Sequence, residues 1–177
     1  MPLTLVTTPG SASANAYCDL AYANALAEEL FPAPTEWPKV SDDERSRAIV
    51  AATRRIDEER LPGQRVDSTQ ALEFPRSGVR VAAEIAYEST TAIPERVKRA
   101  TAMLAIEMHR LWKKQGGQVT GPSENAGLSS FSLGGEFSAT LEPGAGSVSA
   151  LERFFAHVIR PMLGNLVFAP QARVVRG

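Results

Sequence analysis

The sequence predicts a mainly α-helical protein: a small bundle of about four helices with a projecting β-hairpin and an extended C-terminal tail. Three observations predict this class. Apolar residues recur at helical spacing in separate stretches that have helix start or stop signals beside them. One short stretch alternates apolar and polar residues around a pair of glycines. Apolar residues also continue beyond the last predicted helix, where the core should already be closed.

A proline-rich break separates the first two predicted helices. Asn15 or Ser13 is expected to cap the first, because a short side-chain oxygen accepts hydrogen bonds from the amides of the first turn. The Phe-Pro-Ala-Pro run at residues 31–34 ends it. The second begins at the Ser-Asp-Asp-Glu run of residues 41–44, a capping box with extra acid at the positive helix end. It ends near Arg60.

The third and fourth predicted helices have equally clear signals. The third starts at Ile-Pro-Glu, residues 93–95, with proline at its first position, and ends at two lysines before Gly116 and Gly117. The fourth begins at a second capping box, Ser-Ala-Leu-Glu at residues 149–152. Pro161 is expected to bend or shorten it, because proline removes a helical hydrogen bond.

Two segments lie outside this helical pattern. Residues 128–141 alternate around Gly134 and Gly135, which predicts a β-hairpin with a primed turn. Residues 165–177 follow the last helix and still hold apolar side chains; fully extended at ~3.3 Å per residue they would reach roughly 40 Å. Such a tail either folds back on the body or docks on a partner by strand addition. The chain therefore divides into a helical domain, residues 1–164, with the hairpin inserted in it, and an extended C-terminal docking tail, residues 165–177.

A long polar loop, residues 57–78, connects the second and third helices. It is too polar for a strand and too broken by proline and glycine for a helix. Loops of this length inside compact domains are usually functional or disordered. Because Leu72 and Phe74 are interleaved with Arg65 and Arg76, we expect an ordered loop that is held in one shape.

Composition limits the possible functions. A chain of 177 residues, 44% hydrophobic and 22% charged, fits one globular domain. Its net charge of −1 gives no global electrostatic reason to bind nucleic acid or an anionic membrane. The single Cys18 excludes an internal disulfide and fits a reducing compartment. The N-terminus lacks the features of a signal peptide, and no apolar stretch approaches the ~20 residues that span a bilayer. We therefore expect a soluble protein made in a cytoplasm.

Motifs for catalysis, cofactors and metals are absent from the sequence. His109 and His157 lie far apart on helices, without the spacing of a metal pair, so core-edge or surface positions are expected. Cys18 is interpreted as a small buried hydrophobe. The acidic run at residues 42–44 is explained by helix capping, and the glycine pairs follow no phosphate-binding pattern. The sequence predicts no enzyme, no cofactor and no metal site.

A nucleic-acid surface is weighed against a mixed-charge face. Arginines gather around the second helix, as phosphate binding would require, but acidic residues in the same segment largely cancel them. A solvated face or a subunit interface is the favoured interpretation. Trp37 and Trp112 show no basic partners that would make a stacking platform. The arginines are Arg45, Arg47, Arg54, Arg55, Arg60 and Arg65.

Several short motifs occur together over residues 14–108. They include Ala-Ala-Thr-Arg-Arg-Ile-Asp at residues 51–57, Gln-Ala-Leu at 70–72, Pro-Arg-Ser-Gly at 75–78 and Ile-Pro-Glu-Arg-Val-Lys-Arg-Ala at 93–100. In this order they resemble the head–tail adaptor (connector) proteins of tailed bacteriophages, including the group labelled DnaT-like single-stranded DNA-binding proteins.

The resemblance implies a structural subunit of the virion neck. Such a subunit forms a dodecameric homo-oligomeric ring beneath the phage portal protein. The ring links the portal to tail-side neck, stopper or terminator proteins, and DNA passes through its lumen without specific binding. No membrane and no cofactor is implied.

The resemblance also implies roles for two sets of residues. The C-terminal segment commonly binds the portal, which here assigns docking to Phe168, Arg173, Val174, Val175 and Arg176. The loop would hold a structural and inter-subunit network made by Asp57, Arg65, Gln70 and Arg76. Two alternatives remain open: a single-stranded DNA-binding replication protein, and a tail-completion or terminator protein of the same particle.

Overall fold

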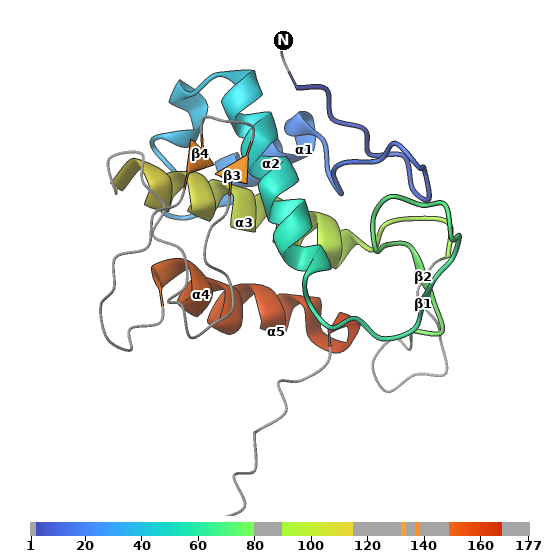
Figure 1. The fold of residues 1–177 in the computed structure, drawn as a ribbon. Helices are drawn as coiled ribbons and strands as arrows, with labels where there is room; N and C mark the ends of the chain where they lie inside the picture. The colour runs from blue at the N-terminus through green and yellow to red at the C-terminus, as the bar shows by residue number, and fades with distance from the viewer. Residues whose placement is uncertain (1–2, 80–89, 115–131, 134–136, 139–148, 168–177) are drawn as a thin grey trace, which may run out of the picture.

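The computed structural model describes residues 3–79, 90–114, 132–133, 137–138 and 149–167 of the chain (Figure 1). This part is mainly helical. The helices are α1 (Leu20–Glu29), η1 (Trp37–Lys39), α2 (Asp42–Asp57), α3 (Glu95–Lys114), α4 (Ala150–Phe154), η3 (Phe155–Ile159), α5 (Arg160–Leu163) and η4 (Gly164–Leu166). The strands are β1 (Gln64–Arg65), β2 (Arg76–Ser77), β3 (Ser132–Leu133) and β4 (Phe137–Ser138).

Helix α3 is the centre of the fold. Helices α1 and α2 pack on one side of it, and the nearly continuous run α4–η3–α5 packs on the other (Figure 1). Its buried face carries Val97, Ala100, Leu104 and Ala105 at helical spacing. The described core therefore has three helical layers, and the sequence-based prediction of a mainly helical bundle is confirmed at this level.

The predicted helix starts are confirmed for α2 and for α4. The Ser41 side chain accepts a hydrogen bond from the Glu44 amide, and the Ser149 side chain accepts one from the Glu152 amide. The start of α1 was predicted wrongly, because its cap is Asp19, whose carboxylate accepts from the Tyr22 amide at 2.8 Å.

Asn15 has a different role from the predicted cap. It accepts from the Val6 amide at 2.8 Å and donates to the Thr4 carbonyl oxygen at 2.9 Å. The Asn15 side chain thus ties the N-terminal segment to the body.

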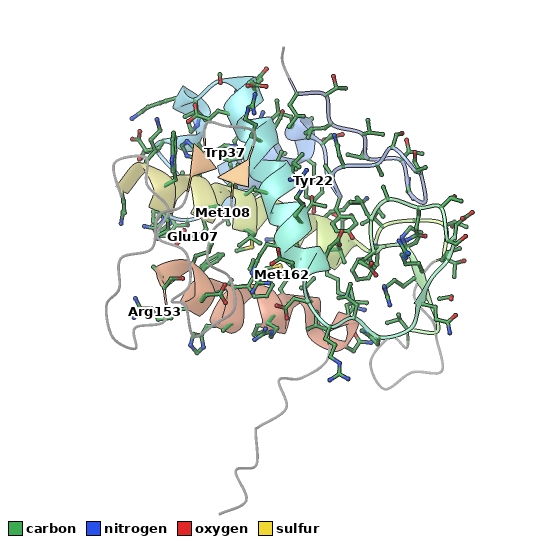
Figure 2. The ribbon with its side chains drawn as sticks, in the orientation of Figure 1. Tyr22, Trp37, Glu107, Met108, Arg153 and Met162 are labelled. Carbon is green, nitrogen blue, oxygen red and sulfur yellow. The ribbon has the colours of Figure 1, made fainter. Side chains whose placement is uncertain are left out.

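The C-terminal helical run contains a wide π-helical turn, η3, just before Pro161. Proline has no amide hydrogen to donate to a carbonyl one helical turn earlier, and its ring crowds that carbonyl. A π turn relieves this crowding while the helical path continues. Met162 lies on the side of this run that faces α2 and α3, and the exposed Arg153 points away from the body (Figure 2).

The two small sheets differ from expectation in different ways. Strands β1 and β2 pair antiparallel inside the loop that was predicted to contain no strand. Strands β3 and β4 form the predicted antiparallel hairpin, but Leu133 pairs with Phe137, so three residues separate the strands where the primed turn would have two.

The body of the protein extends further toward the C-terminus than predicted. Leu166 and Val167 were assigned to the docking tail, yet both are buried in the core and Leu166 belongs to η4. Asn165 also belongs to η4, and residues 168–177, with the predicted docking residues Phe168, Arg173, Val174, Val175 and Arg176, lie outside the described residues. In the described part of the chain, no helix has the length and apolar character needed to cross a membrane.

Candidate functional site: an ordered loop and an apolar groove

Arg76 holds the two arms of the long loop together. Its guanidinium is buried, with 8% of the residue exposed. It donates to the Pro62 carbonyl at 2.7 Å, to the Gly63 carbonyl at 2.8 Å and to the Leu61 carbonyl at 3.4 Å. An ion pair with Glu73 completes the set. A planar fork with several fixed donors suits this task, because it satisfies neighbouring carbonyls that have no strand partner.

Gln70 organises the other end of the loop. Its buried amide nitrogen donates to the Leu72 carbonyl at 2.7 Å and to the Pro75 carbonyl at 3.2 Å. Its side-chain oxygen accepts from the Asp67 amide at 3.1 Å. Arg65 donates to the Gln70 carbonyl at 3.2 Å. The Gln70 amide thus uses both its donor and its acceptor on the loop backbone.

Asp57 anchors the base of the loop to α2 and to the N-terminal segment. Its carboxylate accepts a hydrogen bond from the Tyr17 hydroxyl and one from the Glu73 amide at 3.4 Å. The Tyr17 hydroxyl in turn accepts from the Phe74 amide at 3.1 Å, and the two rings meet edge to face. Burial raises the pKa of the Asp57 carboxyl to about 7, while the hydrogen bonds from Tyr17 and from the Glu73 amide act against that rise.

One glycine is required at the closure of the loop. Gly63 has a φ angle of +73°, a conformation that residues with side chains rarely adopt. A Cβ atom there would also collide with the Ser77 carbonyl oxygen. The tight approach of β1 to β2 therefore depends on the absence of a side chain at Gly63.

The structure brings all the predicted loop residues into one region. Arg65, Gln70 and Arg76 act within the loop, and Asp57 acts at its base. Every contact described above lies within one chain, so the inter-subunit part of the prediction stays a prediction. The tip of the loop, residues 63–69, is exposed and contains the apolar Val66.

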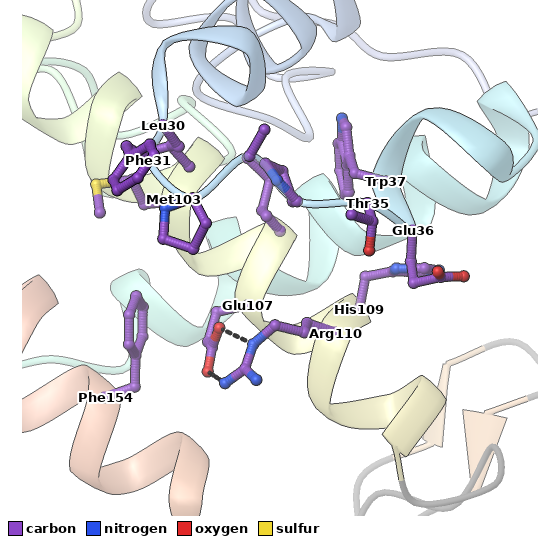
Figure 3. Close-up of a pocket in the computed structure, with 14 residues that line it drawn as sticks. Leu30, Phe31, Thr35, Glu36, Trp37, Met103, Glu107, His109, Arg110 and Phe154 are labelled. Carbon is purple, nitrogen blue, oxygen red and sulfur yellow. Dashed lines mark hydrogen bonds and ion pairs between the residues drawn. The ribbon is translucent and has the colours of Figure 1, made fainter.

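An apolar groove of about 490 Å³ lies between the break after α1, the C-terminal half of α3 and the start of the C-terminal helices (Figure 3). Met103 and Ile106 of α3 contribute to its lining. Phe154 faces Phe31 across it, as Figure 3 shows. Phe31 itself is 100% exposed. The Phe-Pro-Ala-Pro run was interpreted only as a helix stop, and its role as a groove wall was missed.

Polar groups line one end of the groove. Glu107 and Arg110 form an ion pair on α3, with the Arg110 Nε 2.6 Å from a Glu107 carboxylate oxygen. His109 is buried beside Trp37, and burial lowers the pKa of its imidazole. The imidazole Nε2 lies 3.6 Å from a Glu44 carboxylate oxygen. Core-edge or surface positions were expected for the two histidines; His109 is buried in the core, and His157 is exposed.

The arginine-rich face of α2 is mostly paired with acids. Arg45 pairs with Asp42 and Arg47 with Asp43 along the helix. Arg55 makes longer-range contacts that were not predicted from the sequence. Its guanidinium lies over the Phe155 ring at 4.0 Å and contacts the carboxylates of Glu59 at 2.9 Å and Glu152 at 3.3 Å. These contacts join α2 to the C-terminal helices, so this arginine is used inside the fold.

The expectation that Trp112 has no basic partner was wrong. The Lys113 ammonium lies 4.8 Å from the centre of the Trp112 ring, so this tryptophan does have a basic neighbour. Lys113 also lies 3.7 Å from Glu44, which offsets its charge locally.

The described residues include side chains of the types that bind metals and one cysteine, Cys18. Within these residues no cluster of three or more His, Cys, Asp or Glu side chains is placed to bind a metal. Cys18 is buried, and burial raises the pKa of its thiol to about 12, which keeps it protonated at neutral pH.

The fold and these two features describe a helical protein with a fixed loop and a separate apolar groove. The family model described as "Putative DnaT-like ssDNA binding protein" matches residues 1–119, which include α1, α2, the ordered loop and α3. The chain belongs to this family. No curated protein and no solved structure matches the chain. Helices α4 and α5 lie beyond the matched residues.

Proposed function

We propose that the chain is a structural head–tail adaptor of a tailed bacteriophage. In this role copies of the chain form a ring beneath the portal protein, connect it to tail-side proteins and leave a lumen for DNA. The resemblance of residues 14–108 to such adaptors motivates the proposal, and membership of the DnaT-like family is compatible with it.

The observation that supports this role best is how the long loop uses its polar side chains. Arg76 and Gln70 direct their side-chain hydrogen bonds to the loop's own backbone. Asp57 is likewise engaged by Tyr17 and by a loop amide. A loop with its polar groups satisfied in this way presents a fixed shape to a partner, as assembly surfaces do, because little ordering entropy remains to be lost on binding.

Charge is compatible with a passage for DNA. The net charge of the chain is −1, and the arginines of α2 described above are paired with carboxylates. A basic wall would hold phosphates and slow their movement. A ring of such subunits would let DNA pass without gripping it.

Deletion of residues 168–177 tests the portal contact. The cut falls after Val167, because Leu166 and Val167 are buried and their removal would damage the core. We expect the shortened protein to keep its circular dichroism spectrum and melting temperature but to lose co-purification with portal rings. Full-length protein is the positive control. Retained binding by the folded, shortened protein would show that the portal contact lies elsewhere.

Single-stranded DNA binding is the second candidate function, favoured by the family description and by Lys113 above Trp112. A base could stack on the tryptophan while the lysine contacts a phosphate. Filter binding of a labelled oligonucleotide over a salt series tests it. Binding that weakens with salt and is lost on Trp112→Ala would support this candidate, whereas no binding at low salt would remove it.

Imaging separates the adaptor from the third candidate, a tail-completion or terminator protein. Negative-stain images of the protein mixed with portal rings should show added density on the portal. Density only at the end of purified tails would favour the terminator.

A further inference from the structure

Two large apolar side chains stand out among the described residues because they are exposed: Phe31, at 100%, and Val66, at 45%. Phe31 follows α1 and borders the groove, while Val66 directly follows β1 in the exposed loop tip. The loop that carries β1 and β2 lies beside the N-terminal end of α3, and the groove lies along residues 103–110 of that helix (Figure 1). One surface therefore has an apolar protrusion and the other an apolar hollow.

The loop tip is held in shape before any partner arrives. The Val66 amide donates to the Pro75 carbonyl at 3.3 Å. The Asp67 carboxylate accepts from the Thr69 amide and from the Thr69 hydroxyl, each at 2.8 Å. These bonds also lower the pKa of Asp67, so it is ionised at neutral pH. A side chain presented by such a tip loses little conformational entropy when it is buried at an interface.

The groove has the matching properties. Phe31, Met103 and Phe154 give it apolar walls, and its volume of about 490 Å³ exceeds that of a valine side chain several-fold. Charged groups also line it: Glu107 and Arg110, which pair on α3, and Glu36, the N-cap of η1, which pairs with Lys39.

The charges of the loop tip complement these pairs. Val66 has Arg65 before it and Asp67 after it, one positive and one negative group on either side of the apolar residue. When Val66 enters the groove, Arg65 can face Glu107 or Glu36, and Asp67 can face Arg110 or Lys39. A groove edge with charges of both signs suits this loop tip better than an all-acidic or all-basic edge would.

We propose that the Val66 tip of one copy inserts into the Phe31 groove of the next copy, so that the chains associate head to tail. The contact joins two different surfaces, which is the kind of interface that generates a closed ring when the rotation between copies allows it. The proposal rests on the ring assembly proposed above and names the surfaces that build it.

Mixed disulfide cross-linking tests the contact. Val66→Cys and Phe31→Cys are prepared as separate proteins; the native Cys18 is buried and protonated, so it does not interfere. After mild oxidation, the mixture should give a covalent dimer on a non-reducing gel, and either protein alone should stay monomeric on that gel. A double variant with both cysteines in one chain should give a ladder of oligomers.

Each other outcome overturns the proposal. A dimer from Phe31→Cys alone would mean that two grooves face each other around a two-fold axis. No cross-link in the concentrated mixture would mean that the two surfaces do not meet.

A charge variant gives an independent measurement that does not depend on cysteine chemistry. Val66→Asp should reduce self-association in analytical ultracentrifugation by at least tenfold without changing the melting temperature. Ala156→Asp, which places the same charge on an exposed position of η3, is the matched control and should associate normally. Unchanged association of Val66→Asp would contradict the inference.

The outcomes also separate this inference from the adaptor role. If the protein cross-links head to tail but does not bind portal rings, the contact between copies is supported and the adaptor role is contradicted. If it binds portal rings but gives no cross-link, the adaptor role is supported and the proposed contact is contradicted.

Discussion

The loop between α2 and α3 and the C-terminal run α4–η3–α5 are both attached to the same helical body, but they are held by different forces. The loop is fixed by hydrogen bonds from Arg76, Gln70 and Tyr17 to backbone and carboxylate groups. The C-terminal run is fixed mainly by apolar burial, since Phe155, Ile159, Leu163 and Leu166 are fully buried. The ion pairs of Arg55 with Glu152 and of Arg160 with Glu59 add to this burial.

The difference shows that hydrogen bonds set the conformation of the loop, whereas apolar burial supplies most of the stabilisation of the C-terminal run. Net stabilisation by a hydrogen bond is small, but leaving a buried partner unsatisfied costs about 1–3 kcal/mol, so a polar network enforces one loop geometry. Apolar burial gives about 1.5–3 kcal/mol for each large side chain and tolerates small shifts. The loop is therefore specified by geometry and the C-terminal run by burial.

The largest expected effect comes from the C-terminal run. Phe155→Ala removes a fully buried ring and the surface beneath the Arg55 guanidinium, so we expect a loss of about 3–5 kcal/mol in the free energy of unfolding. Denaturant titration measures it. Phe154→Ala, one residue earlier and only partly buried at the groove, is the matched control and should lose clearly less. Equal losses would mean that burial does not hold this run.

Arg76→Ala should break the loop with a smaller global cost. It leaves the carbonyls of Pro62 and Gly63 without their donor, for an expected loss of about 2–3 kcal/mol. Limited proteolysis should cut near the loop before the body unfolds. Arg65→Ala, which removes a single bond to the Gln70 carbonyl from an exposed side chain, should change neither measurement by much. Resistance of Arg76→Ala to proteolysis would contradict the proposed network.

Asp57 should make stability depend on pH. Its folded pKa, about 7, lies above its ordinary value of 3.8. Between these values the folded protein keeps a proton that the unfolded chain has released, so stability falls as the pH rises from about 4 to about 7 and is flat above. The side chain is only half-buried, so we expect about 2 kcal/mol over this window.

Denaturant titrations of the native protein and of Asp57→Asn across this range measure the effect. His109, whose pKa is lowered by burial, opposes Asp57 because its protonation in the unfolded chain favours unfolding at low pH. The difference between the two proteins isolates Asp57, and the variant should lack the decline with rising pH. Parallel curves would exclude Asp57 as its source.

The smallest effect should come from the helix caps. Ser149→Ala removes the acceptor for the Glu152 amide at α4, and Ser41→Ala removes the acceptor for the Glu44 amide at α2. Each should lower stability by about 1 kcal/mol, as measured by thermal unfolding. Similar losses would show that capping contributes equally in both regions; a loss confined to one would sharpen the contrast between them.

Local signals were enough to predict much of the fold. The two capping boxes gave the starts of α2 and α4, because they act through atoms three residues apart. The start of α1 was missed because Asn15, a good cap by type, binds the N-terminal segment through Val6 and Thr4, and only the tertiary structure shows this.

The candidate site was less predictable. An ordered loop containing Arg65, Gln70 and Arg76 was expected, but the partners of Arg76 are backbone carbonyls, which a sequence does not distinguish. The groove combines residues 30–37 with parts of α3 and α4, far apart along the chain. Its walls therefore appear only when the helices pack, and Phe31 had no local signal beyond the prolines that follow it.

The burial of Leu166 and Val167 has a mechanical consequence for any load applied through residues 168–177. A force applied to the C-terminus would act first on these two buried side chains and then, through Leu163, on α5. The force would therefore be borne by a cluster of packed aliphatic side chains. Such an anchor would resist a pull without any helix first peeling from the surface.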